Sequence, residues 1–351
     1  ELSALDKVLL YEDIEITRGL LNKAIELDEN LIKAKNLMGT TYAKMGEIDK
    51  AYEIYTLNLK QAEKIGDKRG IGSCLNNIGN IYEFQGEYDK SFDKFLKFIA
   101  ISKELGDQNG LCYAYNGIGV LNSSKGELDS ALAYYEKALE ISEKLNDKSW
   151  IEFLFINMGL VFIKKYDYDK ALSFFGKSLA ICEELDIRYR IAENLNNIGK
   201  LHFIMGDYDK ALDNHKRAIP INDDFRNKYI KPQSLNNIGL SYYIKGDFKK
   251  AVEYLEKSFS LKKENAFEVS DLLLSNISLF LVYKQLGREY NEREIYDLII
   301  ETENIGYEVN YHLYELLEDK SYLETAYNRI QEKADVMEDE LKEKFINYPI
   351  P

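Results

Sequence analysis

Apolar residues along this chain recur at the spacing of amphipathic helices, and the helices come in pairs. In one such pair, Ile71, Leu75 and Ile78 form an apolar stripe, and an equivalent stripe follows after a short break. Residues three and four positions apart lie on one face of a helix, so the pattern predicts helices over residues 68–84 and 88–105. Each unit is therefore expected to consist of two antiparallel helices of roughly 17 residues.

Helix-terminating residues separate the predicted helices. Asp67 precedes the first helix of this pair, where its carboxylate can accept backbone N–H bonds. Gly86 and Gly106 follow the two helices, and glycine adopts the left-handed conformation at a helix end at little cost. The turn after the second helix has Asn146 in one later repeat and Asp186 in the next, so the glycine there is not invariant.

The pair repeats every 40 residues without insertion or deletion. The block Leu-Asn-Asn-Ile-Gly occupies residues 75–79, 195–199 and 235–239, and its glycine belongs to a series of six. These glycines are Gly39, Gly79, Gly119, Gly159, Gly199 and Gly239. An unbroken period of this length predicts copies of one helical unit stacked into a solenoid.

Three columns of residues resemble the tetratricopeptide repeat (TPR) family. An aliphatic residue precedes each glycine, at Met38, Ile78, Ile118, Met158, Ile198 and Ile238. A small residue follows twelve positions after it, at Ala51, Ser91, Ala131, Ala171, Ala211 and Ala251. A large residue, usually aromatic, follows four positions later, at Tyr55, Phe95, Tyr135, Phe175, His215 and Leu255. The 40-residue unit is similar to the variant in kinesin light chains, Leu-Gly-Asn-repeat adaptors and bacterial signalling arrays.

The resemblance implies an all-α fold, a right-handed superhelical solenoid of antiparallel helix pairs. We expect a short-form repeat over residues 1–31, six 40-residue repeats over 32–271, a degenerate repeat over 272–305, and capping helices over 306–351. Atypical end units are expected because a stack must cover the apolar faces at its ends.

Composition and net charge argue against some classes of binding partner and favour one cellular setting. A net charge of −14 repels a phosphate backbone, so we expect no nucleic-acid partner. No run of about 18 apolar residues occurs, so we expect no membrane span. The three cysteines show neither disulfide nor zinc-ligand spacing, which favours a reducing, cytoplasmic setting.

Asparagines dominate the positions that we expect on the inner, concave wall, two and three residues before the glycine and one, four and five after it. A carboxamide offers a donor and an acceptor, as a peptide group does. The candidate peptide-binding residues are Asn36, Asn76, Asn77, Asn80, Asn116, Asn157, Asn196, Asn197, Lys200, Phe203, Asn236, Asn237 and Tyr243. The alternative is that these asparagines bond to the neighbouring repeat and order the stack.

The same wall becomes apolar in the later repeats, with Phe153, Leu160, Ile163, Phe203, Leu240 and Tyr243. A row of exposed apolar side chains is typical of a docking groove for a helix or an extended segment. Burial against a neighbouring or terminal helix explains the row equally well, so both interpretations stay open.

No arrangement of residues predicts catalysis, a metal site or a cofactor. His202 and His215 fall in two aromatic packing columns, where core histidines are expected, and no Gly-rich phosphate loop or HExxH motif occurs. A basic clamp for a peptide C-terminus is not favoured, because Lys33 and Lys200 lie four repeats apart.

The sequence thus favours a non-catalytic scaffold that binds a protein or peptide in a concave groove. The alternative is a regulatory or sensory segment of a larger bacterial signalling enzyme, a kinase or nucleotide cyclase, that acts through dimerisation or a change of conformation. In that case we expect this chain to be a piece of a longer protein. Self-association into a homodimer is a further possibility.

Overall fold

A computed structural model describes residues 14–28, 31–225, 230–265, 267–302 and 304–335, together with Met337, Lys342 and Phe345. The chain divides into two compact units, Glu1–Lys164 and Lys165–Pro351. The first 13 residues, and most of the predicted capping segment after residue 335, lie outside the described residues.

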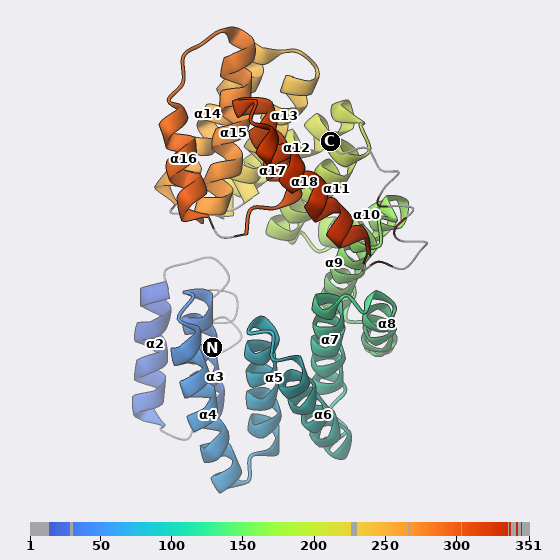
Figure 1. The fold of residues 1–351 in the computed structure, drawn as a ribbon. Helices are drawn as coiled ribbons and strands as arrows, with labels where there is room; N and C mark the ends of the chain where they lie inside the picture. Colours follow the sequence, from blue (N-terminus) through green and yellow to red (C-terminus); the bar gives the residue numbers. More distant parts are fainter. Residues whose placement is uncertain are drawn as a thin grey trace. The chain divides into compact units, whose positions relative to one another are not determined.

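The first unit is a stack of helices that run up and down in turn (Figure 1). Successive helices pack against each other, and α3, α5 and α7 each also contact the next odd-numbered helix. The helices are α2 (Ile14–Leu27), α3 (Ile32–Lys44), α4 (Ile48–Ile65), α5 (Lys68–Phe84), α6 (Tyr88–Leu105), α7 (Gln108–Lys125), α8 (Leu128–Lys144) and α9 (Lys148–Lys164).

The second unit continues the same pattern and adds the helices α16, α17 and α18 at its end (Figure 1). Its helices are α10 (Tyr168–Glu184), α11 (Arg188–Ile204), α12 (Tyr208–Phe225), α13 (Ile230–Ile244), α14 (Phe248–Glu264), α15 (Val269–Leu286), α16 (Glu292–Glu301), α17 (Tyr307–Leu317) and α18 (Lys320–Asp335). No strand occurs among the described residues, and the predicted all-α solenoid of helix pairs is confirmed.

The predicted helix boundaries and caps are confirmed in the pair that introduced the pattern. Helices α5 and α6 span the predicted residues, and the Asp67 carboxylate accepts a hydrogen bond from the backbone N–H of Gly70 at 3.0 Å. Where the turn lacks glycine, Asn146, Tyr166 and Asp186 adopt the left-handed conformation instead, with φ between 51° and 55°. The turn geometry is therefore kept even though its usual residue is lost.

The core of each unit is built from the three packing columns. The small residues of the second helices are fully buried, and the large residues one turn later are at most 3% exposed. Gly39 shows why the repeated glycine is needed: a Cβ atom there would lie 2.5 Å from Cε1 of the buried Tyr55 ring. Glycine on the first helix thus makes room for the aromatic ring of the second.

The terminal helices pack onto the last repeats of the second unit. Leu313 and Leu316 of α17 are buried in one apolar cluster with residues of α14 and α15. Lys284 of α15 donates hydrogen bonds to the carbonyl groups of Glu315 and Leu316, at 3.0 and 3.2 Å, and so ties α15 to the C-terminal end of α17. Helix α17 begins at Tyr307, within the predicted capping segment.

Candidate functional site

Of the predicted asparagines three positions before the repeated glycine, Asn36, Asn196 and Asn236 are buried. Asn36 is 5% exposed, and its Oδ1 accepts hydrogen bonds from Asn58 Nδ2 at 2.8 Å and from the Cys74 thiol at 3.2 Å. Burial raises the pKa of Cys74 to about 11, so the thiol keeps the proton that it donates. Asn36 therefore joins its own second helix, α4, to the first helix of the next repeat, α5.

Asn196 and Asn236 are buried in the same way. The Ser234 hydroxyl donates to Asn196 Oδ1 at 3.0 Å, and the Ser275 hydroxyl donates to Asn236 Oδ1 at 3.4 Å. The role of Asn36, Asn196 and Asn236 in peptide binding stays a prediction. Their burial favours the alternative, in which they order the stack, because each carboxamide already accepts a hydrogen bond from the next repeat.

Five other predicted asparagines form a polar strip, here called the amide surface, on α5, α7 and α9 of the first unit. Asn80 is exposed and the other four are half-buried. Among the described residues, the carboxamides on α5 form no hydrogen bond, and those on α7 and α9 bond only to each other. The amide surface consists of Asn76, Asn77, Asn80, Asn116 and Asn157.

Hydrogen bonds between successive first helices fix the amide surface. Asn157 Nδ2 donates to Asn116 Oδ1 at 2.8 Å. At the C-terminal ends of the same helices, Lys164 Nζ donates to the carbonyl and hydroxyl oxygens of Ser123 at 2.9 and 3.0 Å, and Ser124 donates to a carboxylate oxygen of Glu83 at 2.5 Å. These contacts hold α5, α7 and α9 in register, so the carboxamides keep a fixed spacing.

The second unit carries a smaller set of predicted residues on α11 and α13. Asn197 and Asn237 are half-buried and Lys200 is exposed. Phe203 and Tyr243, also predicted as binding residues, are half-buried and direct their rings to the second helix of their own pair. The Phe203 ring lies 5.5 Å from Tyr208 between centroids, and the Tyr243 ring lies 5.8 Å from Phe248.

Helix α17 accounts for part of the apolar wall of the later repeats. Tyr243 belongs to the same apolar cluster as Val309, Leu313 and Leu317. Burial raises the pKa of the Tyr243 phenol, and the nearby Glu315 carboxylate adds to the increase. Of the two interpretations of the apolar row, burial against a terminal helix therefore holds at Tyr243. Leu160 of the first unit stays 42% exposed.

Of the two histidines in the packing columns, His215 lies in the core as expected, whereas His202 is half-buried. His215 is fully buried beneath Gly199, and neither ring nitrogen has a hydrogen-bond partner. Desolvation lowers the pKa of His215 to about 4 and also lowers that of His202. Across the described ranges, no group of three or more His, Cys, Asp and Glu side chains is arranged to hold a metal ion.

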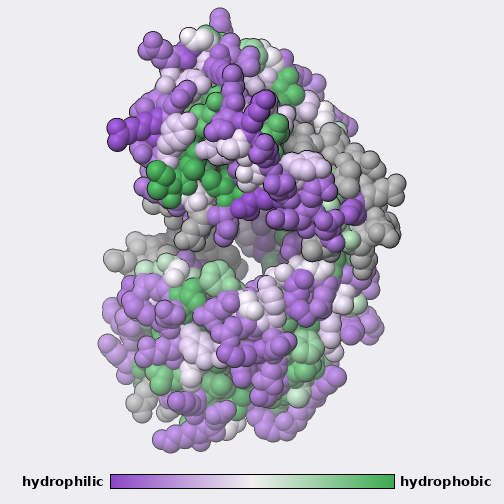
Figure 2. Space-filling model, viewed as in Figure 1, coloured by the Kyte–Doolittle hydropathy of each residue, from purple (hydrophilic) through white to green (hydrophobic). Residues whose placement is uncertain are grey.

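On the face drawn in Figure 2, hydrophilic residues predominate and apolar residues appear as separate patches. In the part of the chain that the structure describes, no helix is both long and apolar enough to cross a membrane.

Stacked antiparallel helix pairs with a glycine-and-aromatic contact define a helical-repeat, protein-interaction scaffold. The chain belongs to the tetratricopeptide repeat family, whose sequence profile matches residues 30–104, 74–144, 150–224 and 190–264. A comparison with curated proteins gave no match.

Solved structures share the fold. A signal-transduction ATPase with a tetratricopeptide repeat sensor, from Pyrococcus horikoshii, is 18% identical over 94% of this chain with a TM-score of 0.66, and the chain spans 46% of that protein. The apo form of RapI is 16% identical, with 87% of this chain and 88% of RapI covered and a TM-score of 0.66. A Rap protein solved with Competence and Sporulation Factor is 16% identical, with coverages of 90% and 85% and a TM-score of 0.51.

Proposed function

We propose that this chain is a non-catalytic scaffold that holds an extended peptide segment of a protein partner on the amide surface. One observation carries the proposal: the carboxamides of Asn76, Asn77 and Asn80 have no hydrogen-bond partner among the described residues, although asparagine is a poor helix former. No hydrogen bond within the described residues of the first unit uses these three carboxamides, so they are available to a partner.

The geometry of the Asn116–Asn157 pair supports the same role. Their mutual hydrogen bond occupies the Asn116 carbonyl and one Asn157 N–H. The Asn116 NH2 group and the Asn157 carbonyl oxygen stay available, which gives one donor and one acceptor on adjacent helices. A peptide group of an extended chain presents the complementary pair without regard to its side chain, so we expect recognition that depends mainly on backbone contacts.

The related structures are consistent with a bound partner. A Rap protein of the same fold was solved in complex with Competence and Sporulation Factor. The negative charge of this chain favours a protein over a nucleic acid as the partner. The three buried free thiols agree with a cytoplasmic setting.

A second candidate function is that of a sensory segment within a larger signalling enzyme. It is favoured by the Pyrococcus horikoshii ATPase, in which a tetratricopeptide repeat sensor accompanies other domains. The two candidates differ in what binding must achieve. A scaffold only holds its partner, whereas a sensor must change the activity of an attached domain, which an assay of the full-length gene product distinguishes.

Binding to the amide surface is tested with a peptide that is selected from a random display library for binding to the purified chain. The peptide is labelled, and its binding is titrated by fluorescence anisotropy. We expect Asn77→Ala combined with Asn80→Ala to weaken binding by about tenfold or more, as expected for the loss of two polar contacts. The control is Glu136→Ala on the exposed face of α8, which is expected to bind as the unchanged protein does. Equal affinity for the double variant and the control contradicts the assignment.

A further inference from the structure

Helices α16 and α18 of the second unit each carry a pair of apolar side chains on the face turned to solvent. On α16, Tyr296 and Ile300 lie four positions apart, and Ile300 is 82% exposed. On α18, Leu323 and Tyr327 have the same spacing, and Tyr327 is 62% exposed. Side chains four positions apart are neighbours on one helix face, so each helix presents a short apolar stripe.

The two stripes belong to helices that pack on one apolar cluster. Leu298 of α16 and Tyr322 of α18 both pack against the cluster that contains the fully buried Ile295. Burial raises the pKa of the Tyr322 phenol, and the nearby Tyr296 adds to the increase, so α16 and the start of α18 lie close together. The surface formed by the two stripes, here called the terminal apolar face, consists of Tyr296, Ile300, Leu323 and Tyr327.

The exposure of this face differs from what a stack requires of its last helices. Ile295 and Ala326 are buried and supply the inward contacts of α16 and α18. Helices that cover the end of a repeat array are expected to be polar on their outer side. Exposed apolar side chains that gather on neighbouring helices are typical of a docking surface for another protein.

Negative charge surrounds the terminal apolar face. Residues 292–324 contain ten acidic and two basic side chains, so this stretch supplies more than half of the net charge of −14. Asp297 and Glu301 lie beside the stripe of α16, and Glu324 lies beside that of α18, all three of them exposed. Carboxylates around an apolar surface attract a positively charged partner. A second copy of this chain would bring the same negative charge and is disfavoured.

We propose that the terminal apolar face binds a basic amphipathic helix of a protein partner. The apolar side chains of such a helix, spaced three and four positions apart, would contact the two stripes. Its lysines and arginines would lie opposite Asp297, Glu301 and Glu324. The two tyrosines supply large contact surfaces with a polar end, as is common at protein interfaces. This surface belongs to the second unit, and its role does not depend on the amide surface of the first.

The test is isothermal titration calorimetry of the full chain with a synthetic amphipathic helix built of leucine and lysine. The comparison peptide has glutamate in place of each lysine. We expect only the lysine peptide to bind. Ile300→Ser is expected to weaken it by about tenfold, because most of an isoleucine side chain is no longer buried on binding. Tyr327→Ser, on the other helix, is expected to weaken it similarly.

The charges are tested with the double variant Asp297→Asn and Glu301→Gln. We expect it to weaken the lysine peptide several-fold at low salt and less at high salt, where exposed charges are screened. The melting temperature of each variant, measured alongside, verifies that it is folded. No measurable heat with the lysine peptide overturns the proposal. Equal binding of the two peptides overturns the assignment of a basic partner.

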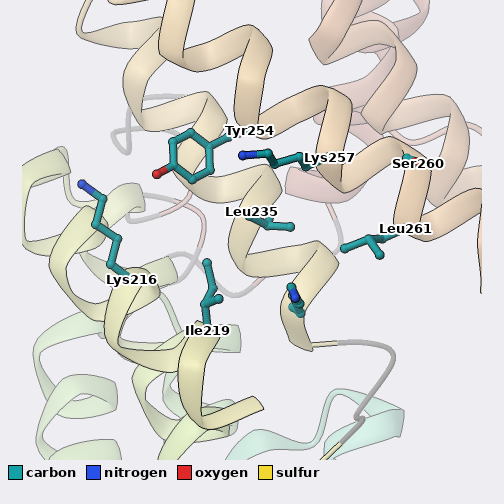
Figure 3. A pocket seen from close by; sticks show the side chains of 8 residues that line it. Lys216, Ile219, Leu235, Tyr254, Lys257, Ser260 and Leu261 are labelled. Carbon is teal, nitrogen blue, oxygen red and sulfur yellow. The ribbon is translucent and has the colours of Figure 1, made fainter. Parts of the chain in front are cut away.

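Two control variants separate this surface from other apolar sites. Leu57→Ser removes a side chain that is exposed on α4 of the first unit, and it is expected to leave the affinity unchanged. The second unit also contains a cavity of about 580 Å³ among α12, α13 and α14, which Ile219, Leu235 and Tyr254 help to line (Figure 3). Tyr254→Ser tests whether the peptide binds in that cavity. A loss of affinity in either control that equals the loss in Ile300→Ser contradicts the assignment.

Discussion

The carboxamide of Asn157 donates a hydrogen bond of 2.8 Å to the carboxamide of Asn116, which lies 41 residues earlier on the preceding first helix of the stack. This contact is one residue out of register with the 40-residue period, because Asn157 lies two positions before its glycine and Asn116 three. The period therefore does not by itself determine which asparagines meet.

We expect the Asn116–Asn157 hydrogen bond to stabilise the stack by about 0.5–1.5 kcal/mol, as is usual for a partly buried pair. The experiment is a double-mutant cycle. Urea denaturation measures the free energy of unfolding of the unchanged protein, of Asn116→Ala, of Asn157→Ala and of the double variant. The non-additive part of the free energies of unfolding measures the pair. Additive effects would show that the two side chains act independently.

The repeated glycine is expected to tolerate no side chain where an aromatic ring covers it. Gly39→Ala places a methyl group 2.5 Å from a Tyr55 ring atom, and we expect the free energy of unfolding to fall by about 1–3 kcal/mol. Gly176→Ala is the matched control, because that helical glycine has no atom within 4 Å of the new Cβ. There alanine is expected to add about 0.5–1 kcal/mol through its higher helix propensity. Thermal denaturation of both variants measures the contrast, and a loss of stability at both positions contradicts it.

His215 is expected to make the protein sensitive to acid. Its pKa is about 4 in the fold and about 6.5 when exposed, so the unfolded chain binds the proton first as the pH falls. Stability is therefore lost between pH 6.5 and 4, by on the order of 3 kcal/mol for this group. The measurement is the free energy of unfolding as a function of pH.

The control for this prediction comes from the same packing column, in which Phe95 and Phe175 occupy the equivalent place. His215→Phe is expected to fold and to remove the contribution of His215 to the pH dependence. If the two proteins lose stability in parallel between pH 6.5 and 4, His215 is not the responsible group.

Lys262 is expected to destabilise the fold at neutral pH. Its side chain is 4% exposed, its Nζ donates to the Ser275 hydroxyl at 2.7 Å, and burial lowers its pKa. Lys262→Met keeps the length of the side chain and removes the buried charge, so we expect a gain on the order of 1 kcal/mol at pH 7.

The gain from Lys262→Met should shrink as the pH rises through the lowered pKa of Lys262, because the folded lysine then becomes neutral while the unfolded one stays charged. Denaturation at pH 7 and pH 10 checks both signs. A gain that is the same at both pH values would show that burial of the charge is not its cause.

The amide surface could be predicted only in part, and its residues show why. Asn76 and Asn196 occupy the same column, but Asn196 is buried and accepts a hydrogen bond from Ser234, whereas Asn76 has no such partner among the described residues. The residue 38 positions after Asn76 is Ala114, which carries no side-chain donor. A side-chain donor 38 residues after the asparagine, as Cys74 is for Asn36 and Ser234 for Asn196, was the sequence signal for an asparagine that bonds within the stack. Its absence after Asn76 was the signal for a carboxamide that stays available.

The sequence by itself determined the helix pairs, their boundaries and the columns that pack them, because each depends on residues close in the chain and repeated every 40 positions. Only the tertiary structure decided which side chains remain available. Enclosure of Asn36 and contact of α17 with Tyr243 both depend on what the neighbouring helix presents. A periodic pattern specifies the shape shared by all the repeats, whereas burial depends on the particular residues that face one another across each interface.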